Sequence, residues 1–134
     1  MTKAQWLRDR SQKFAIDIIK SATDYLEIIG PRQIAGQLHD AANSAAMNYR
    51  ATCRARSDAE FAAKICITVE EADEAQGWLE TLIKSKRASG DEAQRLLIES
   101  SELLKIFAAS KRTIMRRLAA KPPSPRRRRQ SPNP

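Results

Sequence analysis

The stretch RARSDAEF, residues 54–61, decides how this chain of 134 residues folds. Within it, Ser57 is followed three residues later by Glu60, which is the capping-box spacing that begins an α-helix. Apolar residues recur at helical spacing both before and after the stretch. It therefore predicts a short connection between two helices, and short connections force neighbouring helices to run antiparallel.

The same helical spacing continues through most of the chain, which predicts four α-helices and no strands. Gly30-Pro31 is expected to separate the first two, and Ser89-Gly90-Asp91-Glu92 repeats the capping-box spacing before the fourth. The expected fold class is all-α: an up-down-up-down antiparallel four-helix bundle that forms one domain over residues 1–120. The expected helical segments are residues 3–29, 31–55, 57–82 and 89–118.

The end of the chain has a different composition. Residues 121–134 read KPPSPRRRRQSPNP and hold five of the six prolines of the chain. Proline breaks helices, and a segment without large apolar residues cannot join a core. We expect this segment to be a disordered basic tail.

Several classes of protein are disfavoured by the sequence. No apolar run approaches the ~20 residues that a membrane span needs, and the start, MTKAQWLRDRSQKF, lacks an apolar signal core. Cys53 and Cys66 form neither a CxxC pair nor a metal-ligand spacing. Folding the helices back about residues 56–57 places Cys53 level with Glu60, about 9 Å from Cys66 along the axis. We expect both cysteines to be unpaired and to pack as small apolar residues. We also expect a cytoplasmic protein that does not bind membranes.

Catalytic chemistry is also missing from the sequence. His39 is the one histidine, and no Gly-rich phosphate loop or HExxH motif occurs. Glu70, Glu71, Asp73 and Glu74, with Glu99 and Glu102, could suggest a dimetal site, but such bundles use Glu-x-x-His motifs that are absent here. We expect solvated carboxylates or salt bridges to a neighbouring subunit, with no metal, no cofactor and no enzyme activity.

Basic residues gather at one end of the expected bundle, where the first helix starts, the second and fourth end, and the tail begins. Sixteen of the 24 lysines and arginines fall there, against Asp9, Asp58 and Glu60, in a chain of net charge +8. A field this one-sided indicates a polyanionic partner, above all nucleic acid. An arginine-rich tail can also be a solvated terminus, so that alternative stays open.

We call this end the basic pole. Its candidate nucleic-acid-binding residues are Arg50, Arg54, Arg56, Lys111, Arg112, Arg116, Arg117, Arg126, Arg127, Arg128 and Arg129. The other cations of the basic pole are Lys3, Arg8, Arg10, Lys13 and Lys121.

Three further side chains are candidates for a structural or a ligand-binding role. Asn48 lies on an alanine-rich face, where we favour a buried amide that ties two helices together over a ligand contact. Trp78 is expected to pack in the core or at a subunit interface at the other end of the bundle. Trp6 lies at the basic pole and is a candidate stacking ring for nucleobases.

The middle of the chain contains the most specific series of residues. In order it reads Gln37-Leu38, Ser44, Asn48-Tyr49-Arg50, Arg54-Ala55-Arg56-Ser57, Phe61, Lys64-Ile65, Glu70-Glu71-Ala72-Asp73-Glu74 and Trp78-Leu79-Glu80. This series resembles the four-helix bundle proteins encoded by intervening sequences of bacterial large-subunit ribosomal RNA genes. That family also looks related to the accessory variability proteins of diversity-generating retroelements. The resemblance covers roughly residues 5–118 and leaves out the arginine-rich tail.

The resemblance implies a homopentamer without enzyme activity. Its retroelement relatives bind a reverse transcriptase and nucleic acid through a basic surface. The leading hypothesis is an oligomeric, non-enzymatic nucleic-acid-binding protein, with RNA as the expected ligand. The alternative is a protein adaptor, such as a reverse-transcriptase accessory subunit.

Overall fold

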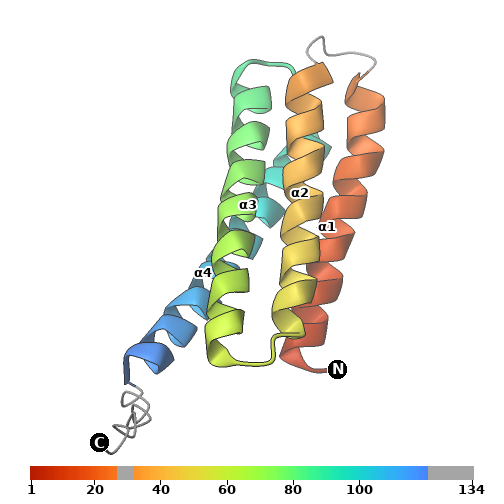
Figure 1. Ribbon diagram of the computed structural model, residues 1–134. Helices are drawn as coiled ribbons and strands as arrows, with labels where there is room; N and C mark the ends of the chain where they lie inside the picture. Colours follow the sequence, from red (N-terminus) through yellow and green to blue (C-terminus); the bar gives the residue numbers. More distant parts are fainter. Residues whose placement is uncertain (27–31, 121–134) are drawn as a thin grey trace, which may run out of the picture.

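The computed structural model describes residues 1–26 and 32–120, and four α-helices make up most of this part of the chain (Figure 1). They pack as a bundle, and no strand occurs in the described residues, so the all-α prediction is confirmed for them. The expected tail at residues 121–134 lies outside the described part. The helices are α1 (Lys3–Leu26), α2 (Arg32–Cys53), α3 (Asp58–Lys84) and α4 (Asp91–Ala120).

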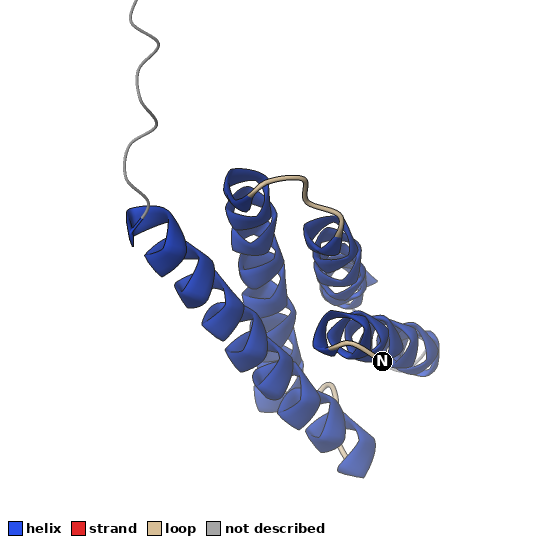
Figure 2. Cartoon of the chain, turned by 90° about the horizontal axis from the view of Figure 1, so that it is seen from below, coloured by secondary structure: helices blue, strands red, loops and turns tan. Residues whose placement is uncertain are grey.

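The helices are not equally close to one another. Figure 1 shows the start of α1, the connection between α2 and α3, and the end of α4 at one end of the molecule. Helices α2 and α3 share the most extensive contact, and α1 and α4 share the smallest among the packed pairs. Helix α4 crosses the other three obliquely and leans away from α1 toward this end (Figure 2).

The core lies along the axis where the apolar faces of all four helices meet. Phe107, Ile18, Ile65 and Leu96 are among its most deeply buried side chains. The rings of Phe107 and Tyr49 pack against each other with centroids 5.1 Å apart. Helix α2 contributes small side chains, which let its backbone approach its neighbours closely. Its buried alanines are Ala35, Ala41, Ala42, Ala45 and Ala46.

One of the two predicted caps is confirmed. The Ser57 hydroxyl accepts a hydrogen bond from the Glu60 amide at 3.1 Å, and α3 begins at the next residue. The prediction for Ser89 is wrong, because α4 begins only at Asp91. Gly90 leads into that helix with a positive φ of 93°, and its carbonyl accepts from the Gln94 amide at 3.3 Å.

The predicted register between α2 and α3 is also wrong. The buried hydroxyls of Thr52 and Thr68 lie 3.4 Å apart. This contact brings residue 52 level with residue 68, so folding the chain symmetrically about residues 56–57 does not describe the hairpin. The cysteines are free, but Cys53 is exposed and Cys66 only half-buried, so Cys53 is not the packing residue that we expected.

Asn48 does not tie two helices together. Its side-chain amide donates to the Ser44 carbonyl at 2.8 Å and to the Ser44 hydroxyl at 3.1 Å, both within α2. The polar contact between α2 and α3 is the threonine pair instead. Trp78 is half-buried against the core, as expected for a structural residue, and its indole donates to Glu74 at 3.2 Å.

The two serines allow a matched test of capping. We expect Ser57→Ala to lower the free energy of unfolding by about 1 kcal/mol, because the Glu60 amide loses its acceptor. Ser89→Ala should change it by no more than a few tenths of that amount, since Ser89 is exposed and precedes Gly90. Urea denaturation of both variants measures the difference, and equal losses would contradict the assigned caps.

Candidate nucleic-acid interface

The ends of two helices present the candidate cations. Arg50 lies in the last turn of α2, and Arg117 lies in the last turn of α4. Carbonyl groups at a helix C-terminus carry partial negative charge, so a cation there stabilises the helix whether or not a ligand is present. The exposed candidates are Arg50, Arg54, Arg56, Arg112, Arg116 and Arg117, and Lys111 is half-buried.

Some cations of the basic pole have carboxylate partners. The Arg10 guanidinium binds Glu99 in a two-pronged contact, with Nε 3.0 Å from each carboxylate oxygen, and it also contacts Glu102. Lys13 lies 3.0 Å from Asp17. The prediction of free cations is therefore wrong for Arg10 and Lys13, because α1 and α4 supply carboxylates beside them. Arg8 lies near Asp9, and the exposed Arg117 lies 3.5 Å from Asp58.

Apart from the half-buried Lys111, the remaining candidates fall into two groups. Arg50, Arg54, Arg56, Arg112 and Arg116 are exposed and form no ion pair within the described residues. The four arginines of the expected tail lie outside the described part of the chain. The free cations at the ends of α2 and α4 are therefore the surface from which an interface can be built.

Ion pairs also hold α1 against α4. Arg95 of α4 lies 3.0 Å from Asp17 of α1 and 2.6 Å from Glu92 of its own helix. Burial raises the pKa of Asp17, but hydrogen bonds from Lys13 and Arg95 outweigh it, so the pKa stays below its usual range. The hydrogen bond from Arg95 likewise lowers the pKa of Glu92. With the pair between Arg10 and Glu99, these contacts fix where the two helices meet.

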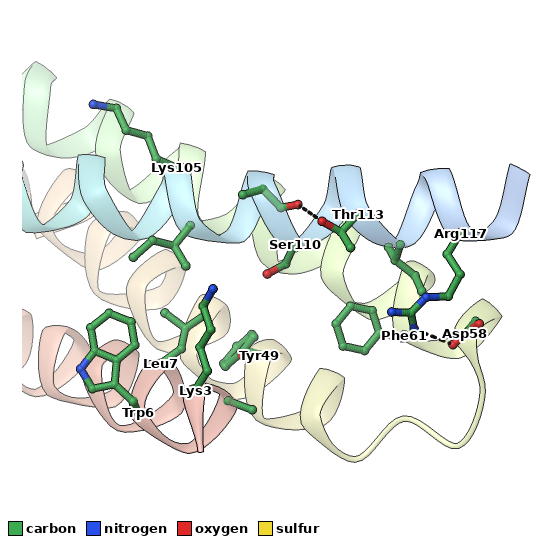
Figure 3. Close-up of a pocket in the computed structure, with 14 residues that line it drawn as sticks. Lys3, Trp6, Leu7, Tyr49, Asp58, Phe61, Lys105, Ser110, Thr113 and Arg117 are labelled. Atoms are coloured by element: carbon green, nitrogen blue, oxygen red, sulfur yellow. Dashed lines mark hydrogen bonds and ion pairs between the residues drawn. The ribbon is translucent and has the colours of Figure 1, made fainter. Parts of the chain in front are cut away.

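Nearer the basic pole, a groove lies between α1 and α4. It has a volume of about 730 Å³ and is bordered also by α2 and α3 (Figure 3). Its floor is apolar and buried, with Leu7, Tyr49 and Ile114 exposed by 5% or less. Burial raises the pKa of the Tyr49 hydroxyl well above its usual range, so this phenol stays neutral.

The groove stays open because α4 turns small and polar side chains toward it. Ala109, Ser110 and Thr113 line it at helical spacing, between the larger Ile106 and Arg117. None of the three is long enough to reach α1 and fill the space. These small side chains are the signal of the groove that the sequence contains, but they do not determine the angle at which α4 crosses the bundle.

Two side chains of α1 point into the groove. Figure 3 shows Trp6 and Lys3 reaching from α1 toward α4. Trp6 keeps 43% of its surface exposed, and the guanidinium of Arg10 lies 5.2 Å from its ring centroid. Sequence reasoning found Trp6 and Lys3 at the basic pole, but it did not connect them with the cavity.

Other kinds of site have little support in the described residues. No group of three His, Cys, Asp or Glu side chains there is arranged to hold a metal ion. Within the same residues, no helix has the length and apolar character to cross a bilayer. In the acidic run of α3, burial and the neighbouring Glu74 and Glu70 raise the pKa of Glu71, as expected for crowded carboxylates.

These features define a helical bundle that has one basic end and a groove between its first and last helices. The chain belongs to the 23S rRNA-intervening sequence protein family, whose model matches residues 6–109. A crystal structure of a protein of unknown function from the S23 ribosomal protein family of Bacteroides thetaiotaomicron has the same fold. The TM-score is 0.76 at 24% identity, over 83% of this chain and 99% of the other. Comparison with curated proteins gave no match.

The ion pairs between α1 and α4 predict a specific loss of stability in acid. A carboxylate with a lowered pKa stabilises the fold above its unfolded pKa of about 4, and this stabilisation is lost as the pH falls through the folded value. At neutral pH we expect Asp17→Asn to lower the free energy of unfolding by about 1 kcal/mol, and the deficit should shrink toward about pH 3.

The control is Asp73→Asn, which removes an exposed carboxylate that forms no ion pair within the described residues. Thermal melts across this pH range compare both variants with the original protein. A deficit in Asp17→Asn that is independent of pH would show that the ionised carboxylate does not stabilise this contact.

Proposed function

We propose that this protein is a non-enzymatic RNA-binding protein that holds RNA phosphates at its basic pole. The observation that carries the proposal is the group of exposed cations without carboxylate partners in the described residues. These are Arg50, Arg54 and Arg56 at the end of α2 and Arg112 and Arg116 on α4. Such cations attract a phosphate backbone and release its counterions.

RNA is favoured over other polyanions by the family to which the chain belongs, which is named for sequences that interrupt 23S rRNA. Cations on exposed side chains neutralise phosphates without reading a sequence. Binding by the basic pole is therefore expected to depend strongly on salt and weakly on sequence. The expected tail, with Arg126 to Arg129, adds further phosphate contacts in this proposal.

We also propose that the protein acts as a homo-oligomer, and the family resemblance points to a pentamer. Several large apolar side chains are exposed away from the groove, as expected where subunits meet. They are Ile16, Ile19, Met47, Ile67 and Ile98. An oligomer repeats the basic pole, and linked sites bind one long RNA more tightly than a single site does.

The basic pole can be tested by removing its charge. Replacing Arg112, Arg116 and Arg117 by glutamine, or deleting residues 121–134, should weaken RNA binding and reduce its salt dependence. For every phosphate that is no longer neutralised, the slope of log affinity against log salt should become shallower by about 0.7–0.9. Fluorescence anisotropy with a labelled RNA at several salt concentrations measures both effects.

The matched control removes three charges at the opposite end of the bundle. Lys84, Lys86 and Arg87 are exposed near the end of α3, and their replacement by glutamine should leave both quantities unchanged. If all variants bind RNA as the original protein does, the basic pole is not an RNA site. The adaptor function, with a protein such as a reverse transcriptase as partner, would then be the better hypothesis.

Assembly is tested separately from RNA binding. Light scattering of the purified protein at micromolar concentration should give a particle several times the mass of one 15.1 kDa chain, about five times for the pentamer. Replacing the exposed Ile98 by glutamate should lower this mass if α4 lies at a subunit contact. A particle of 15.1 kDa for the original protein would contradict the proposed oligomer.

A further inference from the structure

Apart from Arg117, which lies on its edge, the groove between α1 and α4 has no part in the phosphate contacts proposed above. We infer that it receives an unpaired base of single-stranded RNA, which stacks on Trp6. This inference rests on the proposed RNA binding and adds to it the kind of RNA that is bound. It draws on the shape of the groove, the setting of Trp6 and the charge at the rim.

The groove is suited to a flat apolar group with polar edges. Its volume of about 730 Å³ lies within the range of about 300–1,000 Å³ that is common for small-molecule sites. The floor is formed by buried side chains such as Leu7 and Ile114, and hydroxyl groups of Ser110 and Thr113 lie on the α4 wall. A base can therefore bury its faces and still find hydrogen-bonding groups at its edge.

Trp6 is held in place for stacking. Arg10 lies over the indole at 5.2 Å, and Arg10 is itself fixed by Glu99 and Glu102 of α4. A cation that is anchored in this way restrains the ring and leaves its other face for a second planar group. Stacking on an aromatic ring is tolerant of base identity, which agrees with the weak sequence selectivity expected of the basic pole.

The charge at the rim matches the backbone on either side of such a base. Lys3 points into the groove, and the exposed Lys105 lies on its α4 edge with its side chain extending away from α1 (Figure 3). Asp58 is the one carboxylate among the lining residues, and it lies beside the guanidinium of Arg117. Arg112 and Arg116 are exposed on the same turns of α4 without lining the groove, so a strand that leaves the groove over this helix meets further cations.

A second copy of the chain fits this groove less well. Docking two basic poles together would bring their lysines and arginines into opposition and would strip water from Lys3 without supplying a carboxylate. Double-stranded RNA fits less well for another reason, because its bases are stacked inside the duplex and cannot enter a pocket. A single strand supplies both a free base and the negative charge.

The test uses the fluorescence of Trp6. The chain has two tryptophans, so Trp78→Phe leaves Trp6 as the one reporter. Three probes are compared at one salt concentration: a single-stranded RNA of about 12 nucleotides, an abasic strand of equal length and charge, and an RNA duplex. We expect the single strand to quench Trp6 and to bind about tenfold more tightly than the abasic strand, whereas the duplex should leave the fluorescence unchanged.

Two variants alter the groove in different ways. Trp6→Ala, with affinity measured by anisotropy, should bind the single strand no better than the abasic strand. Ser110→Leu keeps Trp6 and narrows the groove from the α4 side, so it should weaken both the binding of the single strand and the quenching. Gln94→Leu adds a leucine at an exposed position of α4 outside the groove lining and serves as the matched control with unchanged binding.

The outcomes separate this inference from the proposed function. If all three probes bind equally and none quenches Trp6, the groove does not accept a base, although phosphate binding at the basic pole stands. If the single strand binds Ser110→Leu and the original protein with equal affinity and equal quenching, the base lies elsewhere. Failure of all three probes to bind the original protein would overturn both proposals.

Discussion

The contact between α1 and α4 is the constraint on which the shape of this molecule depends. Elsewhere the helices meet through buried apolar side chains, and the alanines of α2 allow close approach. Between α1 and α4, ion pairs join Arg10 to Glu99 and Glu102, and Asp17 to Arg95, in addition to the shared core. Long charged side chains can join two helices at a few points without matching their surfaces along the whole length. Helix α4 can therefore cross the bundle obliquely, and the groove is what that crossing leaves open.

The same oblique crossing divides the basic pole. Figure 2 shows the end of α4 on one side of the start of α3, with the end of α2 on the other. The first turn of α3 carries Asp58 and Glu60, whose negative charges interact favourably with the positive end of the α3 helix dipole. The exposed arginines of α2 and α4 thus flank a small acidic region. In the proposed function, this arrangement suits a flexible strand that contacts each row in turn better than a stiff rod.

Several features set by neighbouring residues could be predicted from the sequence, although the cap at Ser89 and the pair between Lys13 and Asp17 show that local reasoning also failed. Features set by the register and crossing of helices could not be predicted. Ser57 caps α3 because its partner is three residues away, and the apolar spacing placed Phe14, Ile18 and Phe107 in the core. The register of α2 and α3 depends on Thr52 meeting Thr68. Likewise, Arg10 was counted as a free cation because its carboxylate partners are about ninety residues further along the chain. The groove depends on the crossing angle of α4, which a helical repeat does not determine.

Helix stability alone does not explain the charge at the basic pole. It can account for Arg50 and Arg117, which lie in the last turns of their helices, where cations are favoured. It does not account for Arg56, which precedes the N-terminus of α3, where the helix dipole disfavours a cation. Nor does it account for Arg112, which lies outside the last turn of α4, beyond the reach of that end effect. An external anion gives these two cations a role. The binding of phosphates alone would not require an apolar groove beside them, but such a groove suits the base that accompanies each phosphate in RNA.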